Sequence, residues 1–274
     1  MAKLVAGNKH GGLTFAIEAG SQRLRDVINK NVSDDDIDNA VKLAFKQGWN
    51  RAKLYFMIGL PTETDDDLIA IANMCEHVLE IARQSVEEKR KHSVSVSVSC
   101  AIFVPKPQTP FMFDGQISIA EANRRLGLIR KNLVSKAINF SWHSPYTSQI
   151  EAVLSRGGRE CSNLIYKAWE NGACFDAWND HFNYQYWEDA ANSLNMNLEK
   201  MAGWSTDIVQ EDYDCKDFPW SHIDFGVDEK FFVSERLKAD KSQKTPDCSF
   251  EGCVGCGACK NLNLDLQIAG ERKC

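Results

Sequence analysis

The stretch Tyr55-Phe56-Met57-Ile58-Gly59-Leu60-Pro61-Thr62-Glu63-Thr64 decides the expected fold of this chain. It continues an apolar run that begins at Ala52 and is typical of a buried strand, and its Gly-x-Pro turn cannot extend a ladder of hydrogen bonds. Thr64 is expected to cap a helix whose first turn carries three aspartates. The stretch therefore predicts a strand that ends in a tight turn at the start of a long helix.

The sequence on either side continues this alternation of strands and helices. Strands are expected at 13–17, 52–58 and 93–99, and helices at 21–30, 33–48, 64–82 and 118–133. Alternation with crossovers of this length predicts an α/β fold with a parallel sheet. Because three strands are too few to close a barrel, they fit the second half of one or a small open sheet.

The character of the chain changes near residue 141. Helices are expected at 144–154, 161–171 and 184–194. The many aromatic side chains of 166–187 are expected to form a core rather than a base-stacking platform, because little basic charge lies among them. We therefore divide the chain into an α/β part at 1–140, a helical accessory region at 141–204 and an irregular, cysteine-rich tail at 205–274.

Composition limits the classes of function. The 274 residues carry a formal net charge of −6, which gives no electrostatic reason to expect nucleic-acid binding. No apolar run reaches the roughly 18 residues of a membrane span, and the first residues lack the apolar core of a signal peptide. A cytoplasmic location without membrane contact is expected, and the ten cysteines are interpreted as thiols or metal ligands rather than disulfides.

Four of those cysteines form the compact series Cys248-x4-Cys253-x2-Cys256-x2-Cys259, with three glycines between them. Four thiolates within so short a segment favour a metal site over free thiols. The overlapping Cys-x2-Cys spacing favours an iron–sulfur cluster, with zinc as the alternative. Cys274 is a further candidate ligand that could replace one of the four.

A second polar segment follows the first expected strand. In Phe15-Ala16-Ile17-Glu18-Ala19-Gly20-Ser21-Gln22-Arg23-Leu24, a carboxylate, a glycine, a serine and an arginine lie between a strand and a helix. Glu18 can accept hydrogen bonds from an ammonium group or a ribose hydroxyl, while Ser21 and Arg23 can hold a carboxylate. The alternative interpretation is that Ser21 only caps the helix and Arg23 is a surface side chain.

Together, these two segments resemble the radical S-adenosylmethionine (radical SAM) superfamily. Residues 15–24 are similar to the Glu-Ser-Gly-Ser region after the fourth barrel strand of this superfamily. Residues 55–64 are similar to the Gly-x-Ile-x-Gly-x-Pro-Gly-Glu motif of the fifth strand. The segment Phe103-Val104-Pro105-Lys106-Pro107-Gln108-Thr109-Pro110-Phe111 resembles a sixth-strand loop of the same proteins. The resemblance is greatest to uncharacterised bacterial proteins that join a cobalamin-binding domain to a radical SAM domain, and it extends into the tail through 219–224.

The resemblance implies particular roles. Glu18 and Ser21 would contact the methionine or ribose part of S-adenosylmethionine, and Arg23 its carboxylate. Ile58, Gly59 and Pro61 would border the adenine. The serines that alternate with valines in the third expected strand would face the barrel interior, although the alternation alone also allows the opposite facing; they are Ser95, Ser97 and Ser99.

The chain departs from the family pattern in one decisive respect. The Cys-x3-Cys-x2-Cys triad that binds the catalytic cluster is absent from its sequence, and Ala19 and Thr62 replace residues usual in the family. The expected fold is accordingly the C-terminal half of a partial (βα)6 TIM-like barrel, containing strands four to six. A [4Fe–4S] cluster with one open iron site is required for reductive cleavage of the cofactor.

The leading hypothesis is that the chain is the C-terminal part of a radical SAM enzyme acting on an unknown substrate and is inactive alone. Its expected partners are a separately encoded N-terminal half carrying the triad and an electron donor such as flavodoxin or ferredoxin. The competing hypotheses are a non-catalytic zinc-binding module for protein or RNA contacts, and a truncated gene product.

Overall fold

The computed structural model describes residues 12–206 and 218–264. The chain divides into two compact units, Met1–Phe103 with Ile119–Pro145 and Val104–Ser118 with Tyr146–Cys274. The three-part division suggested by the sequence stays a prediction. Among the helices of the described ranges, none combines the length and the apolarity of a membrane-crossing segment.

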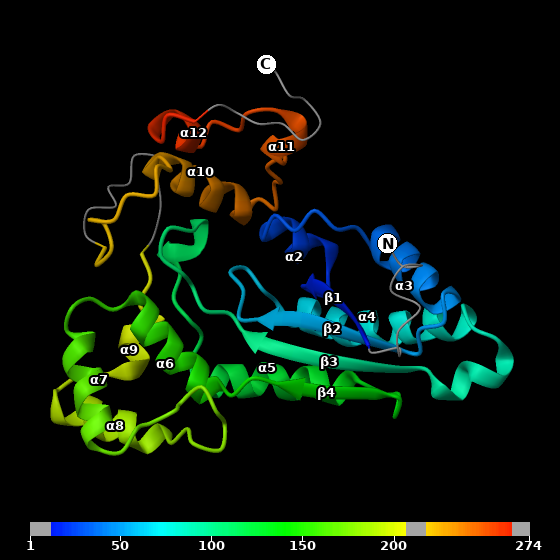
Figure 1. Cartoon of the computed structure of the whole chain (residues 1–274), viewed down its shortest axis with the longest axis horizontal. Helices are drawn as coiled ribbons and strands as arrows, with labels where there is room; N and C mark the ends of the chain where they lie inside the picture. The colour runs from blue at the N-terminus through cyan, green and yellow to red at the C-terminus, as the bar shows by residue number, and fades with distance from the viewer. Residues whose placement is uncertain (1–11, 207–217, 265–274) are drawn as a thin grey trace. The chain divides into compact units, whose positions relative to one another are not determined.

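The first unit is built on a parallel sheet (Figure 1). Its strands lie in the order of the chain and are β1 (Leu13–Glu18), β2 (Arg51–Ile58), β3 (Ser95–Ile102) and β4 (Ile138–Trp142). The three strands expected from the sequence are confirmed, but the count of three was wrong. The alternating residues Ile138, Phe140 and Trp142 allow β4 to pair with β3 along its whole length.

Helices and one short turn connect these strands. They are α2 (Gln22–Val27), α3 (Asp34–Lys46), α4 (Asp65–Gln84), η1 (Glu88–Ser93) and α5 (Ile119–Asn132). Ser33 and Asp36 form a capping box at the start of α3, in which each side chain bonds the other residue's backbone N–H. The apolar stripe of α4 is buried as expected from its 3.6-residue period.

The two faces of the sheet differ in chemistry. In β2, Ala52, Leu54, Phe56 and Ile58 are buried, whereas the intervening side chains are half-buried or exposed. In β3 the valines are buried in the same way, and Ser95 and Ser97 lie on the opposite face. The apolar face therefore packs against the helices and the polar face is the one that a barrel would enclose, which is the arrangement expected for part of a TIM-like fold.

The second unit is mainly helical. It contains η2 (Pro110–Phe113), α6 (Pro145–Arg156), α7 (Cys161–Glu170), α8 (Tyr184–Ser193), α9 (Leu198–Gly203), α10 (Glu229–Asp240), α11 (Cys248–Glu251) and α12 (Ala258–Asn261). One hydrophobic core is formed by side chains of α6, α7, α8 and α9, and another contains side chains of η2 and α10. The expectation of an irregular tail was wrong at α10, because Phe232 and Val233 bury one side of a regular helix.

The expected aromatic core of this region forms only in part. Trp187 is buried, but Trp169, Phe175 and Trp178 are 61%, 70% and 68% exposed. Small residues on the inner side of α7, including Ala168, supply the packing and turn Trp169 outward. The prediction of a core was therefore wrong for these three aromatic side chains.

The turn between β1 and α2 lies tightly against α4. A Cβ atom on Gly20 would come within 2.2 Å of the backbone nitrogen of Ile71, so no other residue fits there. Arg25 is fully buried and donates hydrogen bonds to the carbonyls of Ala19 (3.1 Å) and Gly20 (3.2 Å), and it also pairs with Asp34. The turn is thus fixed by close packing on one side and by a buried guanidinium on the other.

We expect Gly20→Ala to lower the free energy of unfolding by about 3 kcal/mol, because the added methyl group overlaps helix backbone that cannot move alone. Chemical denaturation of the full chain measures this change. The matched control is Gly127→Ala in the interior of α5, where nothing lies within 4 Å of the added carbon. This control should be neutral or stabilising by about 0.5–1 kcal/mol, and an equal loss in both variants would contradict the packing argument.

Candidate functional site

The two polar segments meet at one edge of the sheet. Strands β1 and β2 are parallel neighbours, with Ala16 opposite Tyr55 and Glu18 opposite Phe56. The turns that follow them therefore lie side by side at the carboxyl ends of adjacent strands, where α/β proteins commonly bind ligands. A bulge between Ala16 and Glu18 gives Glu18 a φ of 70°, an uncommon conformation for a residue with a side chain.

Asp67, in the first turn of α4, binds side chains of the turn that follows β1. Its Oδ1 accepts a hydrogen bond from Ser21 Oγ at 2.5 Å, and its Oδ2 pairs with the guanidinium of Arg23. Ser21 Oγ also accepts the Leu24 N–H at 3.1 Å, so Ser21 caps α2 while it donates to Asp67. Ser21 thus caps α2, as one of the two sequence interpretations proposed. Both Ser21 and Arg23 are already bonded to Asp67 within the protein.

The carboxylate of Asp67 also binds the turn that follows β2. Asp67 Oδ2 accepts hydrogen bonds from the backbone nitrogen and the hydroxyl of Thr64, at 2.9 and 2.8 Å. Arg23 continues across the turn and donates to the hydroxyl and the carbonyl of Thr62, at 3.2 and 2.9 Å. The carboxylate of Asp67 and the guanidinium of Arg23 therefore join the two polar segments. From the sequence alone, only the order of these segments along the chain was known.

The surroundings of Asp67 favour its charged form. Its side chain is 4% exposed, and burial alone would raise the pKa. The hydrogen bonds from Arg23, Ser21 and Thr64 outweigh burial and lower the pKa of Asp67 below its ordinary value. The carboxylate is therefore a charged structural centre near neutral pH.

Glu63 fixes the shape of the Gly-x-Pro turn. Its fully buried side chain accepts the Gly59 N–H at 2.8 Å and a hydrogen bond from Arg125 at 2.5 Å. Burial raises the pKa of Glu63 to about 7, against the opposing effects of Gly59 and Arg125. Gly59 has a φ of 82°, which the tight turn requires and glycine adopts freely.

The remaining predicted cofactor residues differ in accessibility. Glu18 is 25% exposed and lies 3.6 Å from Lys30, and Arg23 is 41% exposed despite its internal bonds. The side chain of Ile58 is buried on the helix-facing side of the sheet, and its carbonyl accepts the Phe103 N–H at 2.8 Å. A ligand at this edge would thus meet Glu18, Arg23 and the half-buried Pro61 rather than the Ile58 side chain.

The cysteine series lies in the second unit around α11 and α12. Cys253 is exposed, and Cys248, Cys256 and Cys259 are half-buried free thiols. Within the described residues, no three histidine, cysteine or acidic side chains are gathered in a metal-binding arrangement. The backbone nitrogen of Gly255 does donate to Cys253 Sγ at 3.4 Å, and Cys274 lies outside the described residues.

Hydrogen bonds anchor this segment at the start of α10. Asp228 donates its backbone N–H to the Cys256 carbonyl at 2.9 Å, and Asn261 donates to the Asp228 carboxylate at 2.9 Å. Gly257 has a φ of 82°, and a Cβ atom there would come within 2.4 Å of the Asp228 carboxyl group. The glycine therefore allows the chain between two cysteines to lie against Asp228.

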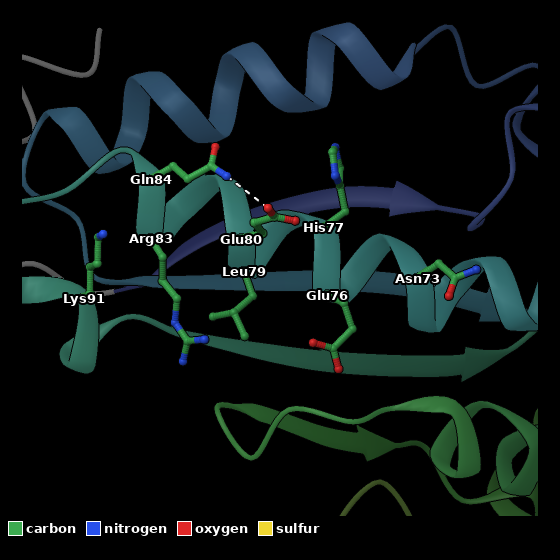
Figure 2. Close-up of a pocket in the computed structure, with 8 residues that line it drawn as sticks. All are labelled: Asn73, Glu76, His77, Leu79, Glu80, Arg83, Gln84 and Lys91. Carbon is green, nitrogen blue, oxygen red and sulfur yellow. Dashed lines mark hydrogen bonds between the residues drawn. The ribbon is translucent and has the colours of Figure 1, made fainter. Parts of the chain in front are cut away.

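A separate pocket of about 570 Å³ lies along the second half of α4 (Figure 2). Its lining residues are Asn73, Glu76, His77, Leu79, Glu80, Arg83, Gln84 and Lys91. Glu76 accepts the backbone N–H groups of Val134 and Ser135, and His77 lies 2.8 Å from Asp38. Asn73 is about 13 Å along the helix from Thr64 at 1.5 Å per residue, so this pocket is distinct from the strand-end site.

Sequence reasoning missed the importance of Asp67. It treated Asp65, Asp66 and Asp67 alike, as favourable charges near the N-terminus of a helix. The spacing Thr64-x-x-Asp67 is a capping-box spacing, and the structure forms that box. This signal could have identified which of the three aspartates turns inward.

Two comparisons with known proteins find matches to this chain. Residues 1–75 match the Radical SAM superfamily. Over 153 residues the chain is 33% identical to a protein of Methanocaldococcus jannaschii described as uncharacterised, in a match covering 56% of this chain and 32% of that protein. The match thus spans about a third of the relative's length, and no solved structure matches the chain.

We expect Asp67→Asn to lower the free energy of unfolding by about 2 kcal/mol near neutral pH, because an amide cannot pair with Arg23 as a carboxylate does. Since the pKa of Asp67 is lowered on folding, its contribution is present above the ordinary value of 3.8 and is lost as the pH falls through the folded value. Denaturation curves measured across this range should show the gap between wild type and variant closing in acid.

The control for this prediction is Asp66→Asn, which makes the same change at an exposed position in the same turn. It should change the free energy of unfolding by no more than about 0.5 kcal/mol. If Asp66→Asn cost as much as Asp67→Asn, the effect would belong to the helix dipole and not to the bridge between the two turns.

Proposed function

We propose that this chain is part of a radical SAM iron–sulfur enzyme and contributes one wall of the S-adenosylmethionine pocket and elements near the substrate. The observation that carries the proposal is the bridge made by Asp67. It joins the two turns at the strand ends, and both turns lie within the range that matches the superfamily. The proposed substrate remains of unknown identity.

The exposed groups at this edge have the charges that the methionine part of the cofactor needs. Glu18 would accept from its ammonium group, and Arg23 would donate to its carboxylate from a guanidinium oriented by Asp67. Ser21 would support this contact through Asp67, and Ile58, Gly59 and Pro61 would border the adenine through their backbone and the proline ring. When bound and cleaved, S-adenosylmethionine supplies the 5′-deoxyadenosyl radical of this chemistry.

The residues present do not fit the catalytic cluster. No Cys-x3-Cys-x2-Cys spacing occurs in the sequence, so we derive no step of electron transfer from this chain. We propose that a separately encoded N-terminal half supplies the triad, with flavodoxin or ferredoxin as the electron donor. We also propose that the chain is related to the members of the superfamily that carry a cobalamin-binding domain. The nucleotide sequence upstream of the reading frame discriminates between a complementing half and a truncated gene product.

Binding of S-adenosylmethionine to the full chain tests the proposed pocket. Equilibrium dialysis with labelled cofactor should give saturable binding, and Glu18→Ala should weaken it about tenfold or more through loss of one charge-assisted hydrogen bond. The matched control is Glu80→Ala, which removes a carboxylate from the distant pocket on α4 (Figure 2).

The Glu80→Ala control should bind S-adenosylmethionine as tightly as the wild type does. Absence of saturable binding to the wild type at millimolar cofactor would contradict the proposal, as would equal affinity in Glu18→Ala. Circular dichroism spectra of both variants establish that any loss does not arise from unfolding.

A second candidate function belongs to the cysteine series. We propose that Cys248, Cys253, Cys256 and Cys259 bind an auxiliary iron–sulfur cluster, with a non-catalytic zinc-binding module for protein or RNA contacts as the alternative. The N–H···S bond from Gly255 supports this, because such bonds stabilise thiolates in metal sites. Left-handed backbone at Gly252, Gly255 and Gly257 gives the segment the tight bends that wrapping around a metal requires.

Metal analysis of anaerobically purified protein discriminates between these candidates. A cluster predicts a brown sample with about four iron and four sulfide per chain, whereas a colourless sample with one zinc would support the zinc module. Cys256→Ser should remove the metal, and the control Cys174→Ser, at an exposed cysteine outside the series, should retain it. Metal-free wild-type protein would contradict both alternatives.

A further inference from the structure

The polar face of the sheet carries two rows of side chains that cross all four strands. The register aligns Thr14, Lys53, Ser97 and Asn139 in one row. The next row toward the carboxyl ends consists of Ala16, Tyr55, Ser99 and Ser141. Because alternate residues of a strand share a face, both rows lie opposite the buried valines of β3.

Positive charge dominates this face. Arg51 and Lys53 are the cations of the four strands, and both lie on the polar face by their alternation with buried Ala52 and Leu54. The strands contain a single carboxylate, Glu18, which lies 3.6 Å from Lys30. The rest of the face consists of hydroxyl-bearing side chains, one amide, two alanines and Met57.

An aromatic contact orients the side chain of Lys53. Its ammonium nitrogen lies 4.6 Å from the ring centroid of Tyr55, close enough for a cation–π contact that orients the side chain. In the part of the chain that the structure describes, no carboxylate lies within ion-pair distance of Lys53. Lys53 is half-buried, and the register places Thr14 and Ser97 beside it on the same face of the sheet. The hydroxyls of Thr14 and Ser97 can donate to an acceptor bound next to Lys53.

We propose that this face binds the phosphate group of a small, hydroxyl-bearing molecule, with Lys53 as its principal cation and Thr14, Ser97 and Asn139 as hydrogen-bond partners. Lysine and hydroxyl groups are common phosphate ligands, and the charge of the face is complementary to an anion. Four strands spaced about 4.8 Å apart make a row about 14 Å wide, which fits a metabolite-sized ligand. This inference rests on the proposed function and assigns its substrate to the phosphorylated small molecules.

Inorganic phosphate is the probe for this site. Titration of the full chain with phosphate, at an ionic strength held constant with chloride, should raise the thermal unfolding midpoint in a saturable manner. Lys53→Met should weaken the apparent affinity about tenfold or more, and Lys53→Arg should retain most of it. The matched control Lys46→Met removes an exposed lysine at the end of α3 and should bind as the wild type does.

Three results would overturn the inference: no saturable effect of phosphate on the wild type, equal affinity in Lys53→Met, or equal loss in Lys46→Met. Measuring the affinity of the same proteins for S-adenosylmethionine distinguishes failure of the phosphate site from failure of the proposed function. Lys53→Met should bind the cofactor normally, which also shows that it is folded. A wild-type chain that binds phosphate through Lys53 but not S-adenosylmethionine would overturn the cofactor pocket and leave the anion site standing.

Discussion

The carboxylate of Asp67 is the group on which the strand-end site depends. It accepts hydrogen bonds from Ser21, Arg23 and Thr64, which belong to the two turns of the site. These turns follow adjacent parallel strands, but backbone pairing between β1 and β2 ends before either turn begins. Side chains must therefore fix the relative position of the turns, and Asp67 does so from the first turn of α4.

Buried charge is a recurring means of holding backbone in this unit. Arg25 binds the carbonyls of the first turn, and Glu63 binds the N–H of the second. Each charge is costly to bury unless its partners compensate it, and Asp34 and Arg125 are the ion-pair partners of these two groups. The compensation of Glu63 is partial, because burial still raises its pKa to about 7. Polar interactions thus set the geometry of the edge, while the apolar side chains beneath it supply most of the stability.

The sequence predicts the regular part of this unit better than its site. Apolar periodicity identified β2 and α4 because both bury one face along their whole length. It missed β4, whose five residues are partly exposed, and α10, whose apolar and polar residues do not separate into two clear faces. It placed Ser21 and Arg23 in the correct turn, but contacts across 44 to 46 residues, such as those to Asp67, leave no local pattern.

The strand order of the sheet has a consequence for folding during synthesis. Each strand pairs with the one made immediately before it, so β2, β3 and β4 can dock in turn as the chain leaves the ribosome. Each docking step closes a connection of roughly 35 residues that already contains its own helix, which limits the loop entropy lost. Within these four strands the sheet can therefore grow in one direction, with each docked strand acting as the template for the next.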